Sequence, residues 1–520
     1  MPKRVAFWSL AAVAALCCLA AWPALADSLR LVYPAAPTSL DPHHWPRDPA
    51  AEPVVMTAYG RLVGLKDGLG QLDTSESLAY TIRVSDDDLT YTVRLREGLT
   101  FTDGRPVDSK AALFTFDRLM ASEAGRSLFP HLRGFTIIGD YTFSLALSQP
   151  WPPFMASLAL PQASLISPGL GDRPEGFLND HTLGSGRFMV EAASPTALSL
   201  VLRPDLPSRP KLDRVEFYYA ADPTERLALF LEKEAHLAVE PPAMGLPADR
   251  ALLELPTWET RFLAFNVKSP YLAILGVREA LAILAKEAFS QAKFKPKGYF
   301  PAGLFGGPSP PGPAGGLARA KELLLAIGSP KTPLTLAYPG DEPAAQVDAE
   351  TLGAAFHAHN VPVNLLPLRG QPGRAVAEAG DYDFWLGSRT PQIPSPEMWL
   401  GQFLESTAAG RGNPAYFSDR EADETIRGFR ASLPRDQRER KVGELDALAE
   451  KAAPYVFLYQ KPKRFLADQR LANQKTHPMW PEVWPIQSVN LNPFKGPQPK
   501  APAPPTPVRE FDELVAEPWE

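Results

Sequence analysis

The stretch VSDDDLTYTVRLREGLTFTDGRPV at residues 84–107 decides the fold. In it and just before it, apolar and polar side chains alternate; the apolar ones are Tyr80, Ile82 and Val84 before a turn, and Tyr91, Val93 and Leu95 after it. This alternation predicts two antiparallel strands joined at 85–88, with the apolar side chains on one buried face. Asp108 is the expected N-cap of a helix through Met120, since its carboxylate can accept the free amides of the first turn.

Outward from this hairpin, strand and helix patterns alternate irregularly along the chain. We expect further strands at 29–33, 135–138, 142–147, 188–191, 198–202, 215–219, 262–265, 334–338, 361–366 and 382–386. We expect further helices at 54–63, 223–234, 277–284, 317–327, 345–359, 421–432 and 434–453. The strand, helix, strand order after residue 330 is typical of a small α/β lobe, so the predicted fold class is α/β.

The length of the chain requires more than one packed body. The 520 residues are 45% hydrophobic and 22% charged, which is a globular composition. Single cores stop growing at about 250–300 residues, so at least two bodies are expected. The net charge of -6, with no basic block, argues against nucleic acid as a partner. We expect the protein to act as a monomer.

Residues 1–26 have the pattern of a secretory signal peptide. Lys3 and Arg4 precede an apolar run over 5–19, and Ala24-Leu25-Ala26 matches the small-residue pattern of a cleavage site before Asp27. A membrane anchor, the alternative, needs about 20 apolar residues and no cleavage site. The two cysteines are Cys17 and Cys18, so the mature chain would have neither a disulfide nor a thiolate metal site. Such a chain suits a bacterial periplasm, where a large core replaces disulfides.

Motifs for catalysis or metal binding are not recognisable in the sequence. It contains no GxSxG, HExxH or glycine-rich phosphate loop. His357 and His359 would point apart on a helix, whereas His43 and His44 fall in a predicted loop. We therefore predict no enzyme activity, no cofactor and no metal site. The alternatives are a hydrolase that uses cleft carboxylates, a binder of a nickel complex or haem that uses His43 and His44, and an interaction protein that uses the proline-rich tail.

Several motifs, in order, carry a family resemblance. They are SLDP at 39–42, LAY at 78–80, the stretch 84–107, GSGRF at 184–188, PKLDRVEF at 210–217, FLAFN at 262–266, VREAL at 277–281 and AKELL at 320–324. Together they resemble the family 5 extracellular solute-binding proteins, which include the oligopeptide- and dipeptide-binding proteins of ABC importers. The resemblance spans about residues 29–490.

The resemblance implies a two-lobed periplasmic binding protein of type II, similar to cluster C, with an extra subdomain in the first lobe. Lobe I would comprise 27–265, with an inserted subdomain at about 55–183, and lobe II would comprise 266–459. The chain would return to lobe I over 460–496, and chain crossings near 265 and 460 would form the hinge. Residues 497–520 hold a run with six prolines and an acidic end, and are predicted to be a disordered tail.

The function implied by the resemblance is transport. The chain would capture a peptide, a peptide-like compound or another small polar solute between its lobes in the periplasm, and deliver it to an ABC permease in the inner membrane. A lobe pair of this kind closes only through its extra contacts to the ligand. The alternative ligand is a metal complex or another non-peptide anionic solute.

The resemblance also suggests ligand-binding residues. Trp45, Arg47 and Asp48 fall in the first-lobe loop that borders the ligand in relatives. A gapless match of 383–396 puts Gln392 where peptide binders carry the aspartate that pairs with the peptide ammonium. Glutamine accepts a hydrogen bond but supplies no charge, so a free-amine peptide is put in doubt.

Arg389 stands where the same match usually has an aromatic residue. A fixed guanidinium facing the ligand would favour a carboxylate or phosphate. The other interpretation pairs Arg389 with Glu397 or Asp381 on the surface.

Overall fold

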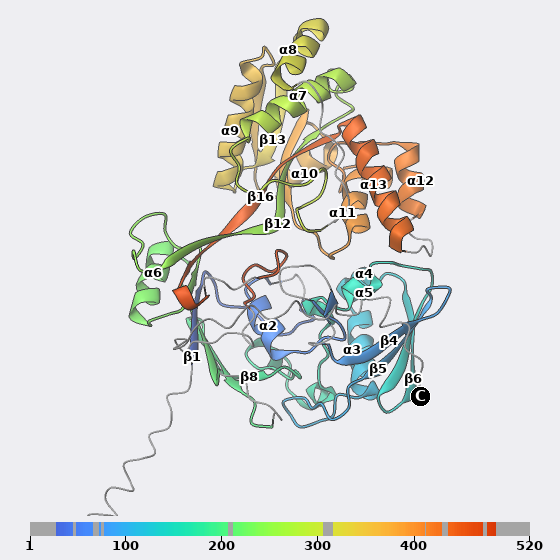
Figure 1. The fold of residues 1–520 in the computed structure, drawn as a ribbon, viewed down its shortest axis with the longest axis vertical. Coiled ribbons are helices and arrows are strands. Elements are labelled where there is room, and N and C mark those ends of the chain that lie inside the picture. The colour runs from blue at the N-terminus through green and yellow to red at the C-terminus, as the bar shows by residue number, and fades with distance from the viewer. Residues whose placement is uncertain are drawn as a thin grey trace, which may run out of the picture.

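The chain folds into two α/β lobes that lie one above the other and are linked by a pair of long strands (Figure 1). The computed structural model describes residues 28–44, 48–65, 72–73, 77–205, 212–304, 316–410, 412–428, 435–471 and 476–484. The predicted signal peptide at 1–26 and the predicted tail at 497–520 lie outside the described residues.

One ten-stranded sheet extends through both lobes. Its strand order is β14 (Val363–Leu368), β13 (Leu334–Pro339), β15 (Phe384–Arg389), β12 (Ala251–Phe265), β16 (Tyr455–Ala467), β11 (Leu237–Val239), β1 (Ser28–Tyr33), β10 (Arg214–Tyr219), β9 (Ala197–Leu202) and β8 (Phe188–Ala193). The β13–β14, β13–β15, β1–β10 and β1–β11 pairs are parallel, and the others are antiparallel.

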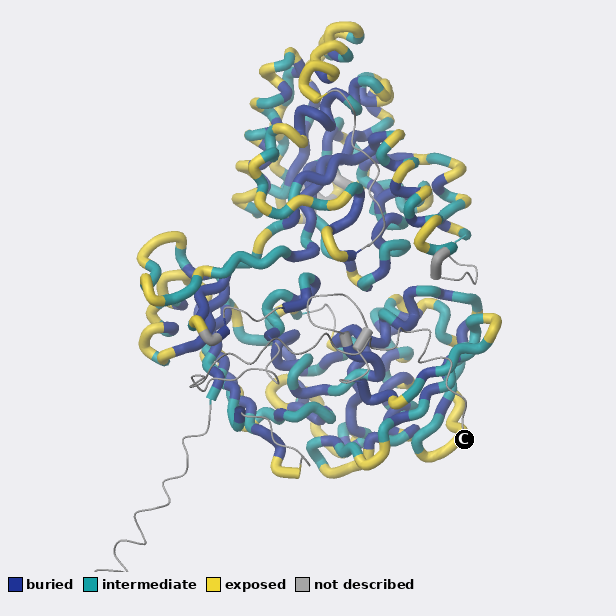
Figure 2. The backbone as a smooth tube through the Cα atoms, viewed as in Figure 1, coloured by how far each residue is buried: buried dark blue, intermediate teal, exposed yellow. Residues whose placement is uncertain are grey.

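Strands β12 and β16 belong to both lobes. In lobe II, β12 pairs with β15 from Thr260 to Phe265, and in lobe I, β16 pairs with β11 from Phe465 to Ala467. Between these points the two strands pair with each other, and this part of β12 is only partly buried, whereas its end in lobe II is fully buried (Figure 2). The expectation of a strand confined to 262–265 was too short, because the strand begins at Ala251 and passes through Pro256.

Lobe II covers its part of the sheet with helices. These are α7 (Leu275–Ala288), α8 (Gly316–Ile327), α9 (Pro343–His357), α10 (Gly370–Ala379), α11 (Pro396–Leu404), α12 (Arg420–Gly428) and α13 (Arg435–Ala452), with the short 3-10 turn η4 (Ser406–Ala408). Helices α7 and α9 contribute Leu281, Leu284 and Leu352 to a core that also contains Leu336 of β13. Their helical spacing of apolar residues is what the sequence pattern predicted.

Lobe I contains a second sheet of four strands. Its order is β4 (Ala79–Val84), β5 (Thr90–Leu95), β7 (Thr142–Leu147) and β6 (Leu132–Gly139). The other elements of lobe I are α2 (Glu52–Ala58), β2 (Gly64–Leu65), β3 (Leu72–Asp73), α3 (Ser109–Ala121), α4 (Glu123–Leu128), α5 (Phe154–Ser157), η1 (Pro161–Ala163), η2 (Pro168–Asp172), η3 (Phe177–Asn179), α6 (Pro223–Glu232) and η5 (Gln469–Leu471). The β4–β5 hairpin is the one predicted from the sequence.

The hairpin departs from the expectation at one residue. Tyr80 was expected on the buried face, but it is 55% exposed. The register shifts between Ala79 and Thr81, and this irregularity turns Tyr80 outward, where Arg94 and Arg96 lie over its ring. The N-cap prediction is confirmed, because the Asp108 side chain accepts a 2.9 Å hydrogen bond from the amide of Ala111.

Candidate functional site

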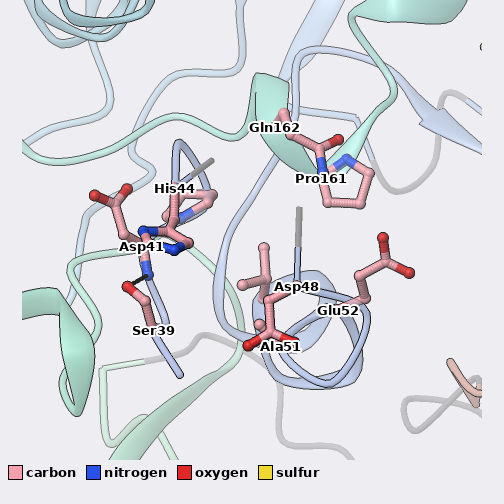
Figure 3. A pocket seen from close by; sticks show the side chains of 10 residues that line it. Ser39, Asp41, His44, Asp48, Ala51, Glu52, Pro161 and Gln162 are labelled. Atoms are coloured by element: carbon pink, nitrogen blue, oxygen red, sulfur yellow. Dashed lines mark hydrogen bonds between the residues drawn. The ribbon is translucent and has the colours of Figure 1, made fainter. Parts of the chain in front are cut away.

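A pocket opens in lobe I between the loop before α2, helix α2 itself and η1. It is an open recess of about 290 Å³, a volume that includes bulk solvent, and it is lined by Ser39, Asp41, Pro42, His44, Asp48, Ala51, Glu52, Val55, Pro161 and Gln162. Figure 3 shows Asp41 and His44 on one side of the pocket, Glu52 on the other, and Pro161 with Gln162 above them. Its walls therefore come from two stretches far apart in the sequence.

Asp48 shapes the wall of this pocket. Its carboxylate accepts hydrogen bonds from the Thr38 amide at 2.7 Å, the Thr38 hydroxyl at 2.8 Å and the Ala50 amide at 2.9 Å. These bonds close the loop from Thr38 onto the turn that leads into α2. Among the described residues that were predicted to bind the ligand, Asp48 lines this pocket.

A half-buried ion pair connects the loop to helix α3. Arg118 of α3 donates to both carboxylate oxygens of Asp41, at 3.0 Å to Oδ1 and at a shorter distance to Oδ2. Burial alone would raise the pKa of Asp41, but the Arg118 hydrogen bonds and charge hold the pKa below its usual range. The pairing explains why a carboxylate is tolerated beside an apolar core.

Two polar contacts hold His43 in the same loop. Its Nε2 lies 3.1 Å from the carbonyl oxygen of Ser164, and its amide donates to Asp41 at 2.9 Å. Burial, followed by the charge of Arg118, lowers the pKa of His43 to about 4. The imidazole is therefore neutral at pH 7, with Nε2–H as the donor to Ser164, and it ties the loop to the chain beyond η1.

The pocket is lined by both apolar and polar residues. Ala51, Val55 and Pro161 are buried, whereas His44 is exposed. The rim carries carboxylate, imidazole and amide groups from Asp48, Glu52, His44 and Gln162. Such a lining suits a small organic group that has both an apolar part and polar atoms.

Arg389 lies at the end of β15 in lobe II. Its Nη1 donates to the carbonyl oxygens of Gly412 at 2.8 Å and Gln402 at 3.4 Å, and its guanidinium lies 4.8 Å from the ring centre of Phe403. Burial lowers its pKa. Among the described residues neither Glu397 nor Asp381 pairs with it, so the surface ion pair considered for Arg389 is not formed.

Of the predicted site residues that the structure describes, Arg389 and Gln392 do not line the pocket beside Asp48. Gln392 is exposed in the loop between β15 and α11. Trp45 and Arg47 lie outside the described residues.

Sequence reasoning missed Glu52 and Gln162 at the pocket. Glu52 could have been noticed, because an acidic residue directly before Pro53 opens the helix that follows the SLDP loop. Gln162 has no local signal, since only the folding of η1 against the loop brings it to the pocket.

The described residues contain neither a metal-ligand cluster nor a membrane-spanning helix. None of the described segments contains a group of three or more His, Cys, Asp or Glu side chains placed to hold a metal ion. Over the same segments, none of the helices combines the length and apolar character needed to cross a membrane.

The family model and the related proteins agree on one family. The family model for bacterial extracellular solute-binding proteins, family 5 (middle), matches residues 73–411. The chain is 26% identical over 460 residues to the probable D,D-dipeptide-binding periplasmic protein DdpA of Escherichia coli K12, covering 84% of this chain and 89% of that protein. It is 30% identical over 344 residues to the glutathione-binding protein GsiB of Salmonella paratyphi A, covering 62% of this chain and 65% of that protein.

A solved structure shows the same fold. HbpA2 from Haemophilus parasuis superposes with a TM-score of 0.76 at 18% identity, covering 87% of this chain and 98% of that chain. The fold of two lobes joined by crossing strands is thus shared over almost the full length of that protein. Since the family model matches well over half of the residues, the chain belongs to the family 5 bacterial extracellular solute-binding proteins.

Proposed function

We propose that this protein is the periplasmic substrate-binding component of an ABC importer and that it captures a peptide or peptide-like solute between its lobes. The observation that carries the proposal is the similarity to DdpA, which extends over 89% of that protein and therefore includes both lobes. Delivery to an inner-membrane permease, export through cleavage of residues 1–26 and action as a monomer are parts of the same proposal.

The proposed lobes keep the bounds expected from the sequence, with lobe I at 27–265 and 460–496 and lobe II at 266–459. Strands β12 and β16 cross between the lobes near these bounds, although residues 260–265 of β12 already pair with β15 of lobe II. The proposed lobe I contact is the pocket beside Asp48, together with Trp45 and Arg47 of the same loop. The proposed lobe II contacts are Arg389 and Gln392.

Arg389 has hydrogen-bonding capacity left for a ligand. Its Nη1 is used by two backbone carbonyl oxygens, and a guanidinium has further N–H donors on Nε and Nη2. A buried cation without a carboxylate partner among the described residues would favour a carboxylate group of the solute. Gln392 would contribute an uncharged hydrogen bond.

Native mass spectrometry of protein purified without denaturation tests the proposal. We expect a released small molecule that fragments as a peptide, and calorimetric binding of D-alanyl-D-alanine or glutathione as probes. Release of a metal complex or of a non-peptide anion would leave the family assignment intact and overturn the peptide proposal.

Replacing Arg389 with alanine tests the lobe II contact. The Arg389→Ala variant should bind a carboxylate-bearing peptide more weakly by about 1.5–3 kcal/mol, because a charge-assisted hydrogen bond is lost. Calorimetry with the peptide released in the mass spectrometry experiment measures the change. The matched control is Arg214→Ala, which removes a partly exposed arginine on the lobe I sheet. Equal affinity of the Arg389→Ala variant and the wild type would remove Arg389 from the binding site.

A further inference from the structure

The two crossing strands pair only with each other in a short two-stranded ribbon between the lobes, which ends where the amide of Glu240 in lobe I donates to the carbonyl oxygen of Arg464 at 2.8 Å. Pro256 of β12 lies directly opposite Pro462 of β16, and Leu255 lies opposite Lys463. In the described residues, β15 pairs with β12 only from Thr260 onward, and β11 pairs with β16 only from Phe465 onward.

The two prolines keep this part of the ribbon narrow. Neither has an N–H group, so neither outer edge of the ribbon offers a donor to a third strand at this level. Two-stranded ribbons twist more than wide sheets do. This is therefore the part of the link between the lobes that bends most easily.

On the lobe II side of the ribbon, β12 carries a fully buried cation. The register between β12 and β16 shifts between Pro256 and Thr260, and Arg261 follows directly with a side chain that is 0% exposed. Its Nη2 donates to Oε1 of Glu342 at 2.8 Å, and its Nε lies 2.8 Å from Oδ2 of Asp348. Both carboxylates belong to lobe II, since Glu342 directly precedes α9 and Asp348 lies in its second turn.

The same two carboxylates also hold β16. Lys461 donates to Glu342, and the Tyr459 hydroxyl donates to Asp348 at 2.6 Å. Lys461 also lies 2.7 Å from Glu259 of β12, which ties the two strands to each other. Each carboxylate at the start of α9 therefore contacts both crossing strands.

We propose that Glu342 and Asp348 act as a clamp that fixes lobe II to the crossing strands. Lobe II then moves as one body with residues 259–265 and 455–461, and the angle between the lobes changes in the ribbon at 255–256 and 462–463, just before Arg464 is bonded to Glu240 of lobe I. Removing one carboxylate leaves the buried guanidinium of Arg261 with a single carboxylate partner. Its positive charge is then incompletely compensated, and water cannot hydrate it there. The use of this clamp in ligand capture rests on the proposed function, but the clamp itself does not.

Amide hydrogen exchange of the full chain without added ligand tests the clamp. In the wild type we expect faster exchange over 252–256 than over 260–265. In Glu342→Gln we expect the amides of 260–265 and 456–461 to exchange at least tenfold faster, and small-angle X-ray scattering to show a larger maximum dimension. Glu322→Gln, which breaks an exposed ion pair with Arg319 on α8, should match the wild type in both measurements.

A second variant covers the case in which Glu342→Gln does not fold. Lys461→Gln removes the contacts of β16 with Glu342 and Glu259 and leaves Arg261 paired, so faster exchange should be largest in β16 and smaller over 260–265 than in Glu342→Gln. Unchanged exchange in the folded variants, or fastest wild-type exchange over 260–265, would overturn the clamp. Calorimetry with D-alanyl-D-alanine and glutathione tests the proposed function and not the clamp. If neither compound binds to the wild type, the proposed function fails, but the exchange result for the clamp is unaffected.

Discussion

Replacing Arg203 with alanine should lower the free energy of unfolding by about 3–5 kcal/mol, because it removes a buried cation and leaves its partners unpaired. Arg203 is 3% exposed and follows β9. Its Nη1 donates to the Thr100 carbonyl at 2.7 Å, and its Nη2 donates to the Thr100 hydroxyl at 2.8 Å and to the Phe101 carbonyl at 3.1 Å. One side chain thus fastens the loop at 100–107 to the main sheet of lobe I.

Urea unfolding followed by circular dichroism measures this loss. Arg214→Ala is the matched control, since Arg214 of β10 bonds the carboxylate of Glu191 at 2.9 Å, two strands away on β8, but is 31% exposed. It should cost less than about 1 kcal/mol, as exposed ion pairs usually do. If both variants lose the same free energy, then the buried bonds of Arg203 do not fasten the loop.

Asp446→Asn should remove the loss of stability with rising pH that Asp446 contributes to the wild type between about pH 4 and pH 7. Asp446 of α13 is fully buried; its Oδ1 accepts the Tyr299 amide at 3.0 Å, and its Oδ2 has no partner among the described residues. Gly298 allows this approach, since a Cβ there would lie 2.7 Å from Oδ2. Burial raises the pKa of Asp446 to about 7, and the charge of Glu450 adds to the increase.

The sign of the effect follows from proton binding. Asp446 keeps its proton in the folded chain up to about pH 7 but loses it near pH 3.8 when unfolded, so the folded state binds more protons in this interval. Stability therefore falls as the pH rises, by roughly 3–4 kcal/mol for a shift of this size. Asparagine does not titrate, so the difference in unfolding free energy between the wild type and Asp446→Asn should change by that amount.

Urea titrations at pH 4.5, 6 and 8 measure that difference. Asp249→Asn replaces an exposed carboxylate, 71% accessible, and should run parallel to the wild type. A parallel profile for Asp446→Asn would contradict the prediction.

Local patterns in the sequence predicted most elements because each pattern has a local physical cause. The β4–β5 hairpin follows from alternation, and the start of α3 follows from the acceptor on Asp108. Tyr80 was misplaced because the irregularity beside it depends on pairing with β5, which the alternation of β4 alone does not reveal. The long extent of β12 was missed because Pro256 indicates a loop unless the strand has a free edge.

Fewer residues of the candidate site than of the helices and strands could be predicted from the sequence. Asp48 was found through a family resemblance, whereas Gln162 reaches the same pocket only through tertiary folding. The contacts of Arg389 with Gln402 and Gly412 likewise join segments that no local pattern connects. Side chains that meet across such separations carry no periodicity, so their partners must be seen in the structure.

The position of β16 in the large sheet has a consequence for how the chain folds. β16 is the last strand of the described residues, yet it lies in the middle of the sheet, between β12 and β11, and Ala467 on it pairs with Ala251 of β12. The two halves of the sheet therefore cannot join until nearly the whole polypeptide has been made. Contacts of such high contact order form slowly. A chain that emerges from the ribosome thus stays incompletely folded until residue 467 is available.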